Sequence, residues 1–184
     1  MKNKPFSRKL LSFLAQVIVY LVVSIPFKVM EVIPGFTDIR PVTLLGPIYA
    51  VFFGPQGCLA FAVGNLITDI VSDSLRWSCI AGFIANFGGP YLIYLYWTRI
   101  SKEDFSLRTG KNILKHIAVV IITAVITSAI ITPSVAIAYP DVDAAFFSVV
   151  VVLNTAGFPI MLGIPMIFLM QEELGFEPVG RKKI

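Results

Sequence analysis

The sequence has 184 residues, of which 57% are hydrophobic and only 14% charged, and its mean hydropathy is +0.83. Soluble globular domains carry about 25% charged residues, so the composition excludes that class and predicts a single all-α integral membrane domain over residues 1–184. The formal net charge of +4 does not indicate a nucleic-acid partner, because 12 of the 15 basic residues lie in the two terminal tails and in residues 98–115. This sorting follows the positive-inside rule and predicts cytoplasmic termini in the cell membrane.

Apolar stretches of the chain predict six membrane segments. A hydrocarbon layer of about 30 Å needs roughly 20 helical residues. The first, fourth, fifth and sixth stretches satisfy that length, whereas the second and third are short. In chain order the expected helices cover residues 9–33, 41–53, 57–71, 77–97, 113–138 and 144–170. They predict a six-helix transmembrane bundle.

The tight turn "GPQG", residues 54–57, joins the two short segments and predicts a helical hairpin. The hairpin either crosses the membrane completely or re-enters it from the outside and stops short of the cytoplasmic surface. Charge cannot decide between these alternatives, because both leave every other segment with the same sidedness. We expect the full crossing, since it gives every segment a place in the bundle.

The third predicted helix carries two unusual faces. Gly57, Ala60 and Gly64 line one face with side chains small enough for close helix contact. Asn65 and Asp69, spaced i and i+4, share a polar face. Hydrogen bonding between helices would account for Asn65 alone, at about 0.6 kcal/mol per bond in membrane bundles.

Counting helix rise places Asn65, Asn86 and Asn154 in roughly one layer near mid-membrane. Each asparagine lies beside glycine or proline residues that loosen a helix, and freed backbone carbonyls must be satisfied inside the protein or in a wet cavity. The pattern therefore indicates an internal polar pocket. Above this layer, Arg40 either reaches the membrane interface or binds an anionic or carbonyl group of a solute, and Trp77 also suits an interfacial aromatic belt.

Signals for catalysis or metal binding are weak. Cys58 and Cys79 have no CxxC or histidine companion, so we expect them to be packing residues. The lone His116 is expected at the cytoplasmic interface. No phosphate-binding loop, HExxH or GxSxG motif is present. We therefore expect no enzymatic activity, no metal and no cofactor.

The run "RPVTLLGPIYAVFFGPQGCLAFAVGNLITD", residues 40–69, together with the predicted topology, resembles the substrate-binding S components of energy-coupling factor (ECF) vitamin transporters, particularly the branch linked to queuosine precursors. The resemblance implies a binding subunit that captures a vitamin or nucleobase-like micronutrient at the outer face, under the 31–40 loop. It also implies a membrane coupling protein and two ATPases as partners. The solute contacts that it implies are Arg40, Asn65, Asp69, Trp77, Asn86 and Asn154.

Docking of the coupling protein in this family often uses small residues on the first helix, where this chain offers only Ala15, followed four residues later by Val19. The small face of Gly57, Ala60 and Gly64 is the alternative docking surface. Other classes stay open: a scaffold subunit of a membrane assembly, an intramembrane enzyme of unknown type, or a secondary transporter of a small solute.

Overall fold

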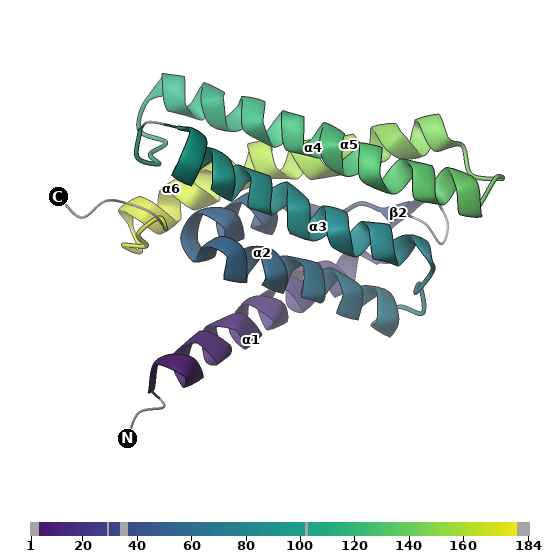
Figure 1. Ribbon diagram of the computed structural model, residues 1–184, viewed down its shortest axis with the longest axis horizontal. Helices are drawn as coiled ribbons and strands as arrows, with labels where there is room; N and C mark the ends of the chain where they lie inside the picture. Colours follow the sequence, from purple (N-terminus) through teal and green to yellow (C-terminus); the bar gives the residue numbers. More distant parts are fainter. Residues whose placement is uncertain (1–3, 29, 34–36, 102, 180–184) are drawn as a thin grey trace.

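Long apolar helices make up most of the structure (Figure 1). The computed structural model describes residues 4–28, 30–33, 37–101 and 103–179. Within these residues, five helical stretches are long and apolar enough to cross a membrane: Arg8–Phe27, Pro41–Val71, Ser78–Ile100, Gly110–Ala138 and Ala144–Glu172. The prediction of a largely helical protein with helices able to span a membrane is confirmed at this level.

The first helix is shorter than the apolar run suggested. Helix α1 covers Lys4–Ser24 and continues as the 3-10 turn η1, Ile25–Phe27. Pro26 has no backbone N–H and disfavours an α conformation in the residue before it, so it ends the helix. The predicted helix over residues 9–33 is therefore wrong in its last part, where strand β1 (Glu31–Ile33) pairs antiparallel with strand β2 (Thr37–Asp38).

A helical hairpin follows, as predicted. The 3-10 turn η2, Pro41–Leu44, leads into α2, Leu45–Val71, which reverses direction at Gly54 (φ 59°, ψ −142°). The rings of Tyr49 and Phe61 lie 6.5 Å apart, whereas a straight helix would separate residues twelve apart by about 18 Å. Glycine suits the turn because positive φ carries no Cβ penalty there, and Pro55 suits the first turn of the second arm.

The remaining helices run back and forth along the molecule (Figure 1). They are α3 (Ser78–Leu95) with the π-helical end η3 (Tyr96–Ile100), α4 (Gly110–Ala138), and α5 (Ala144–Phe158), which continues through the π-helical η4 (Pro159–Gly163) into α6 (Ile164–Glu172). Helix α4 begins before the predicted Ile113 because the Thr109 side chain accepts a hydrogen bond from Asn112 N (3.3 Å). Asp143 caps α5 in the same way, through Ala145 N (2.9 Å) and Phe146 N (3.0 Å).

Neighbouring helices pack in chain order, α1 on α2, α2 on α3, α3 on α4 and α4 on α5, and η4 returns to contact α2. The α2 hairpin therefore lies at the centre of the bundle. The ring of Phe61 contacts two other aromatic rings in this hairpin region, Tyr20 edge-on at 5.0 Å and Tyr49 edge-on at 6.5 Å. Such aromatic pairs add about 0.5–1.5 kcal/mol beyond their area burial.

The small residues of the second α2 arm are used inside the chain. Gly57, Ala60 and Gly64 are all buried. A Cβ at Gly57 would lie 2.4 Å from Tyr49 O, and one at Gly64 would lie 2.5 Å from Tyr20 Cγ. These residues let the two arms and α1 approach closely, so they do not offer the exposed docking face that was expected. Ala15, in contrast, lies exposed on α1.

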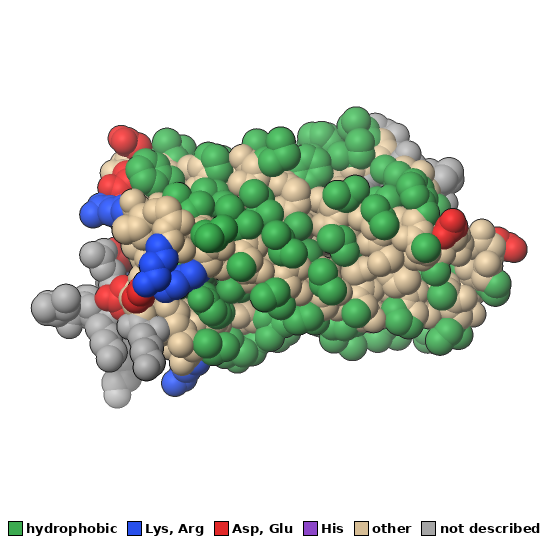
Figure 2. Space-filling model, turned by 90° about the horizontal axis from the view of Figure 1, so that it is seen from above, with side chains coloured by type: hydrophobic (Ala, Val, Ile, Leu, Met, Phe, Trp, Pro, Cys, Tyr) green, Lys and Arg blue, Asp and Glu red, His purple; other side chains and the backbone are tan. Residues whose placement is uncertain are grey.

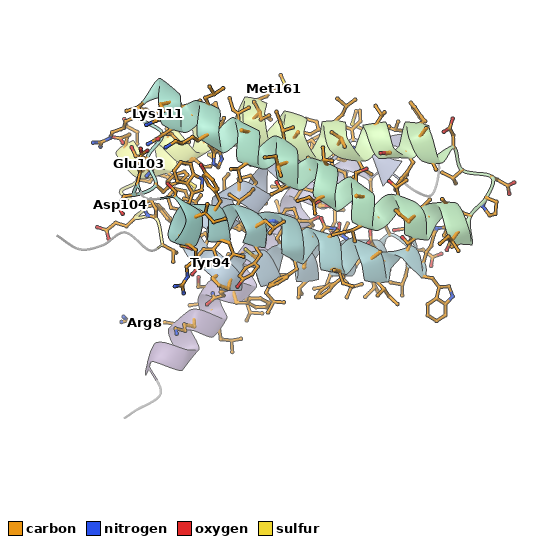
Figure 3. The ribbon with its side chains drawn as sticks, turned by 45° about the horizontal axis from the view of Figure 1, so that its top comes forward. Arg8, Tyr94, Glu103, Asp104, Lys111 and Met161 are labelled. Atoms are coloured by element: carbon orange, nitrogen blue, oxygen red, sulfur yellow. The ribbon has the colours of Figure 1, made fainter. Side chains whose placement is uncertain are left out.

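Charged side chains gather at the ends of the molecule, and apolar side chains cover its middle (Figure 2). We define the basic end as the end that carries Arg8, Glu103 and Lys111 (Figure 3). There, Lys115 Nζ and Lys111 Nζ donate to the Glu103 carboxylate at 2.7 and 3.3 Å and hold the pKa of Glu103 below its ordinary value. The surface between the ends exposes large apolar side chains that suit lipid, among them Leu11, Ile18, Ile84, Ile122 and Leu153.

The turn of the α2 hairpin lies at the same end. Gln56 Nε2 donates to Lys9 O (3.2 Å), and Val179 N donates to Val51 O (2.8 Å). These bonds bring the hairpin turn beside the beginning of α1 and beside the last described residue. Strand β2 and the connections over residues 72–77 and 139–143 lie at the opposite end (Figure 1).

Candidate functional site

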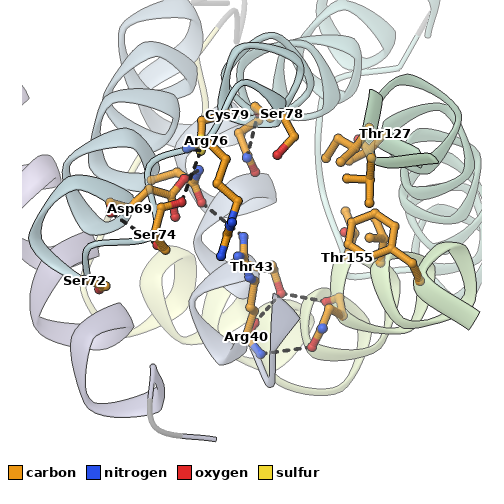
Figure 4. A pocket seen from close by; sticks show the side chains of 18 of the residues that line it. Arg40, Thr43, Asp69, Ser72, Ser74, Arg76, Ser78, Cys79, Thr127 and Thr155 are labelled. Carbon is orange, nitrogen blue, oxygen red and sulfur yellow. Dashed lines mark hydrogen bonds between the residues drawn. The ribbon is translucent and has the colours of Figure 1, made fainter. Parts of the chain in front are cut away.

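A cavity of about 340 Å³ lies between the helices (Figure 4). It lies toward the end opposite the basic end, because its lining includes Ser72, Ser74 and Arg76 of the α2–α3 connection. Its lining is drawn from the segments before and within η2, from helices α2 to α5 and from the α2–α3 connection: Lys28, Arg40, Thr43, Asn65, Asp69, Ser72, Ser74, Arg76, Ser78, Cys79, Gly82, Asn86, Thr127, Ile131, Val135, Phe147, Val151, Asn154 and Thr155. Arg76 is both exposed and part of this lining, so the cavity reaches the surface beside the α2–α3 connection.

The structure brings five predicted site residues together. Arg40, Asn65, Asp69, Asn86 and Asn154 all line this cavity, although up to 114 positions separate them in the chain. The expectation that the three asparagines share one internal polar pocket is confirmed. Their role in binding a solute stays a prediction.

Trp77 does not belong to the cavity. Its side chain is 81% exposed, and the residue is the N-cap of α3 at the end of a short connection. The inference that Trp77 contacts a solute is therefore not supported by its position. An exposed tryptophan at a helix end fits the alternative role in an interfacial aromatic belt.

One wall of the cavity is an ionic network built on Asp69. Its carboxylate accepts from Lys28 Nζ at 3.2 Å and from Asn65 Nδ2 at 3.0 Å. The Asn65 amide oxygen in turn accepts from the Tyr20 hydroxyl at 3.1 Å and from Arg40 Nη1 at 3.3 Å. Because Asp69 and Lys28 are mostly withdrawn from solvent, with 9% and 18% of their side chains exposed, these bonds offset part of the cost of burying charge.

A second set of bonds fixes the backbone around Arg40. The Arg40 amide donates to Asn154 Oδ1 at 3.0 Å. The Thr43 hydroxyl lies 2.8 Å from Arg40 O and 2.7 Å from Asn154 O. Asn154 therefore ties α5 to the start of η2, which places the Arg40 guanidinium against the cavity and beside Asn65.

The wall formed by α3 to α5 is neutral. Asn86 Nδ2 donates to Gly82 O at 2.8 Å. Because a backbone carbonyl can only accept, this bond fixes the orientation of the amide and leaves Asn86 Oδ1 as an acceptor. The hydroxyls of Ser78, Thr127 and Thr155 and the apolar side chains of Ile131, Val135, Phe147 and Val151 complete this side. The cavity thus combines a charged wall with a neutral, partly apolar one.

A smaller pocket of about 20 Å³ adjoins the main one. The two share Thr43, Asn86, Thr127 and Thr155, and the smaller one continues between the helices past Ala85 and Gly89. A space of this size with several polar groups is enough for about one water molecule or one small substituent.

Several lining residues were not predicted from the sequence. Lys28 had no predicted role, and Cys79 was expected to be a packing residue. Helical spacing would have found part of the α3 wall, because Cys79, Gly82 and Asn86 fall at i, i+3 and i+7 on one face. No sequence signal identified Thr127 and Thr155, since hydroxyl residues are common in membrane helices as interhelical bonding groups.

The two cysteines differ in their surroundings. Cys58 is fully buried, as expected for packing. Cys79 is a half-buried free thiol on the cavity lining, where its sulfur accepts from Arg76 N at 3.3 Å and lies 3.7 Å from Ser74 O. A thiol reagent that enters the cavity would therefore meet Cys79 and not Cys58.

His116 lies inside the bundle and is not exposed at the surface of the molecule. Its side chain is completely buried, and its Nδ1 accepts from Trp97 Nε1 at 3.2 Å. The ring of Phe105, in the α3–α4 connection, lies edge-on at 5.6 Å, so this connection covers the histidine from the basic end. Among the described residues, no group of three or more His, Cys, Asp or Glu side chains could hold a metal ion.

Comparisons with protein-family models, with curated proteins and with solved structures found no match to this chain.

Proposed function

We propose that this chain is the solute-binding subunit of a membrane importer of the ECF type, which captures a small polar solute such as a vitamin or nucleobase-like micronutrient. The observation that carries the proposal is the cavity of about 340 Å³ in which Arg40, Asn65, Asp69, Asn86 and Asn154 converge. Ligand pockets usually occupy about 300–1,000 Å³ and combine apolar walls with a few placed polar groups. Ionisable residues inside a membrane bundle commonly mark a solute or ion pathway.

The proposed orientation has the basic end in the cytoplasm and the mouth of the cavity outside the cell membrane. The positive-inside rule supports it, because Arg8 and Lys9 lie at the start of α1, Arg108 lies in the α3–α4 connection, and Lys111 and Lys115 lie at the start of α4. Both arms of the α2 hairpin then cross the membrane, so the bundle has six crossings with both termini inside. The second arm, residues 55–71, is roughly 25 Å long at 1.5 Å per residue, which suits a slightly thinned or shielded crossing.

Import against a gradient needs an energy source, and the sequence has no phosphate-binding loop for ATP. We therefore propose that a membrane coupling protein and two ATPases act with this chain. The exposed α1 face that carries Leu11, Ala15, Ile18 and Val22 is the proposed docking surface. It replaces the buried small residues of α2 in that role.

Native mass spectrometry of protein purified from cells in a nutrient-rich medium tests binding. We expect a small molecule to be retained and to slow modification of Cys79 by a thiol reagent, because Cys79 lines the cavity. A Cys79→Ser variant, which keeps only buried Cys58, is the control for labelling elsewhere. Repeated preparations without a retained molecule would contradict the proposal and favour a scaffold role.

Proteoliposomes that contain only this protein test the coupling. We expect binding of the solute without its accumulation. Accumulation driven by a proton or sodium gradient would instead identify a secondary transporter, with Asp69 and Lys28 as the first residues to examine.

A further inference from the structure

Gly82 occupies an unusual position in α3. It is buried and lines the cavity, yet a Cβ added there would meet nothing within 4 Å apart from its chain neighbours and the backbone of its own helix. Buried glycines elsewhere in the bundle serve close packing: a Cβ at Gly64 would come within 2.5 Å of Tyr20 Cγ, and one at Gly89 within 2.8 Å of Thr127 Oγ1. The empty space in front of Gly82 is therefore the cavity itself.

Packing within the chain does not explain a glycine at this position. Gly is less favourable than Ala in a helix interior, and the backbone conformation at Gly82 is one that other residues adopt, since only Gly54 and Gly175 have positive φ among the described glycines. An alanine would fit here without a clash. The missing side chain keeps part of the cavity wall bare.

Asn86 stands one turn further along the same face. Its Nδ2 is engaged by Gly82 O at 2.8 Å, so the bare wall and the orientation of the amide belong to one local arrangement. The Asn86 carbonyl oxygen has no donor among the described residues, whereas Asn65 on the opposite wall uses both ends of its amide within the ionic network. Asn86 on the neutral wall therefore keeps an acceptor for a solute, whereas the amide of Asn65 on the ionic wall is fully engaged within the protein.

We propose that Gly82 and Asn86 form the specificity-determining wall of the cavity. The solute packs against Gly82, and Asn86 Oδ1 accepts a hydrogen bond from an uncharged N–H or O–H group of the solute. The inference rests on the proposed function, because it needs a solute in the cavity. Thr127 and Thr155, which line both the main cavity and the adjoining pocket of about 20 Å³, are placed to bond a small substituent or one water beyond Asn86. The solute class is therefore a compound with a neutral hydrogen-bonding edge.

The test compares two glycines of α3. Gly82→Ala and Gly82→Leu place side chains of increasing size in the cavity, and Gly88→Leu is the matched control, because a Cβ at Gly88 also meets no atom within 4 Å while Gly88 lines neither pocket. Purified proteins are incubated with a mixture of free nucleobases and water-soluble vitamins. Native mass spectrometry identifies the retained compound, and thermal unfolding reports stability.

We expect Gly82→Ala to unfold at the same or a higher temperature than the wild type and yet to retain less of the compound. Gly82→Leu is expected to lose affinity by at least about tenfold, as for an added methylene group in a fitted site, while Gly88→Leu retains the wild-type compound. Equal retention by Gly82→Leu and the wild type would overturn this inference and leave the binding function intact. A wild type that retains no compound would overturn both.

Discussion

Gly64 lies directly against the ring of Tyr20, so close that a Cβ on Gly64 would stand 2.5 Å from Tyr20 Cγ. The same tyrosine donates its hydroxyl to Asn65 Oδ1 at 3.1 Å. The contact of α1 with the second arm of α2 therefore sets the position of the ionic wall. Tyr20 therefore takes part both in the packing of α1 on α2 and in the hydrogen bonds of the candidate site.

Gly64→Ala should destabilise the protein by about 1–3 kcal/mol, because the added methyl group overpacks the contact with Tyr20. Thermal unfolding in a mild detergent measures the effect. Gly88→Ala is the control and should not lower the unfolding temperature, since no atom lies within 4 Å of the added Cβ. Equal unfolding temperatures for the two variants would show that α1 does not pack on Gly64 as described.

Asp69→Asn should lower the free energy of unfolding by about 1.5–3 kcal/mol, the usual worth of hydrogen bonds to a charged group. The substitution removes the negative charge that faces Lys28 Nζ at 3.2 Å. Asp73→Asn is the matched control, because Asp73 is exposed and its positive φ of 51° is tolerated by asparagine. The network described above predicts a clear difference between the two variants in thermal unfolding, and an equal effect would contradict it.

Asn86→Leu and Asn154→Leu should differ from each other. Asn86→Leu removes the proposed contact with the solute but only one local bond, to Gly82 O, so binding should weaken by about 1–3 kcal/mol with little change in stability. Asn154→Leu also deprives the Arg40 amide of its acceptor, so both binding and unfolding temperature should fall. If both variants bind the retained compound with wild-type affinity, the prediction is wrong and the two asparagines only connect helices.

The orientation of the hairpin can be tested with single cysteines in a background that lacks Cys58 and Cys79. A cysteine replacing Gln56, whose side chain bonds Lys9 O at the basic end, should react only from the cytoplasmic side. A cysteine replacing Ser74, on the cavity lining, should react only from outside. Labelling of both positions from one side would exclude a crossing by the second arm.

Local backbone chemistry made much of the fold predictable. The break at Gly54 followed from a Gly-Pro pair between two short apolar runs, and the positive φ there explains why. The end of α1 was missed because the apolar run continues past Pro26, and hydropathy gave no weight to the missing N–H of that proline. The β1–β2 pair was missed for the same reason.

The site was predictable where depth in the membrane constrained it. Counting helix rise placed Asn65, Asn86 and Asn154 in one layer, and the structure places them on one cavity. The side of the helix on which a residue lies was harder to predict. The sequence does not show which groups contact Trp77 or the small face of Gly57 and Gly64. Small residues favour close approach in general, and only the tertiary structure identifies Tyr49 and Tyr20 as the groups that approach them.

Binding of a small solute in the cavity can be measured by the rate at which a membrane-impermeant thiol reagent modifies Cys79 from outside in membranes. Cys79 is a half-buried thiol on the cavity lining, and Cys58 is fully buried. With the mixture of nucleobases and vitamins present, we expect slower modification of Cys79 in the wild type and in Gly88→Leu, and much less protection in Gly82→Leu. A modification rate of wild-type Cys79 that is the same with and without the mixture would contradict this expectation.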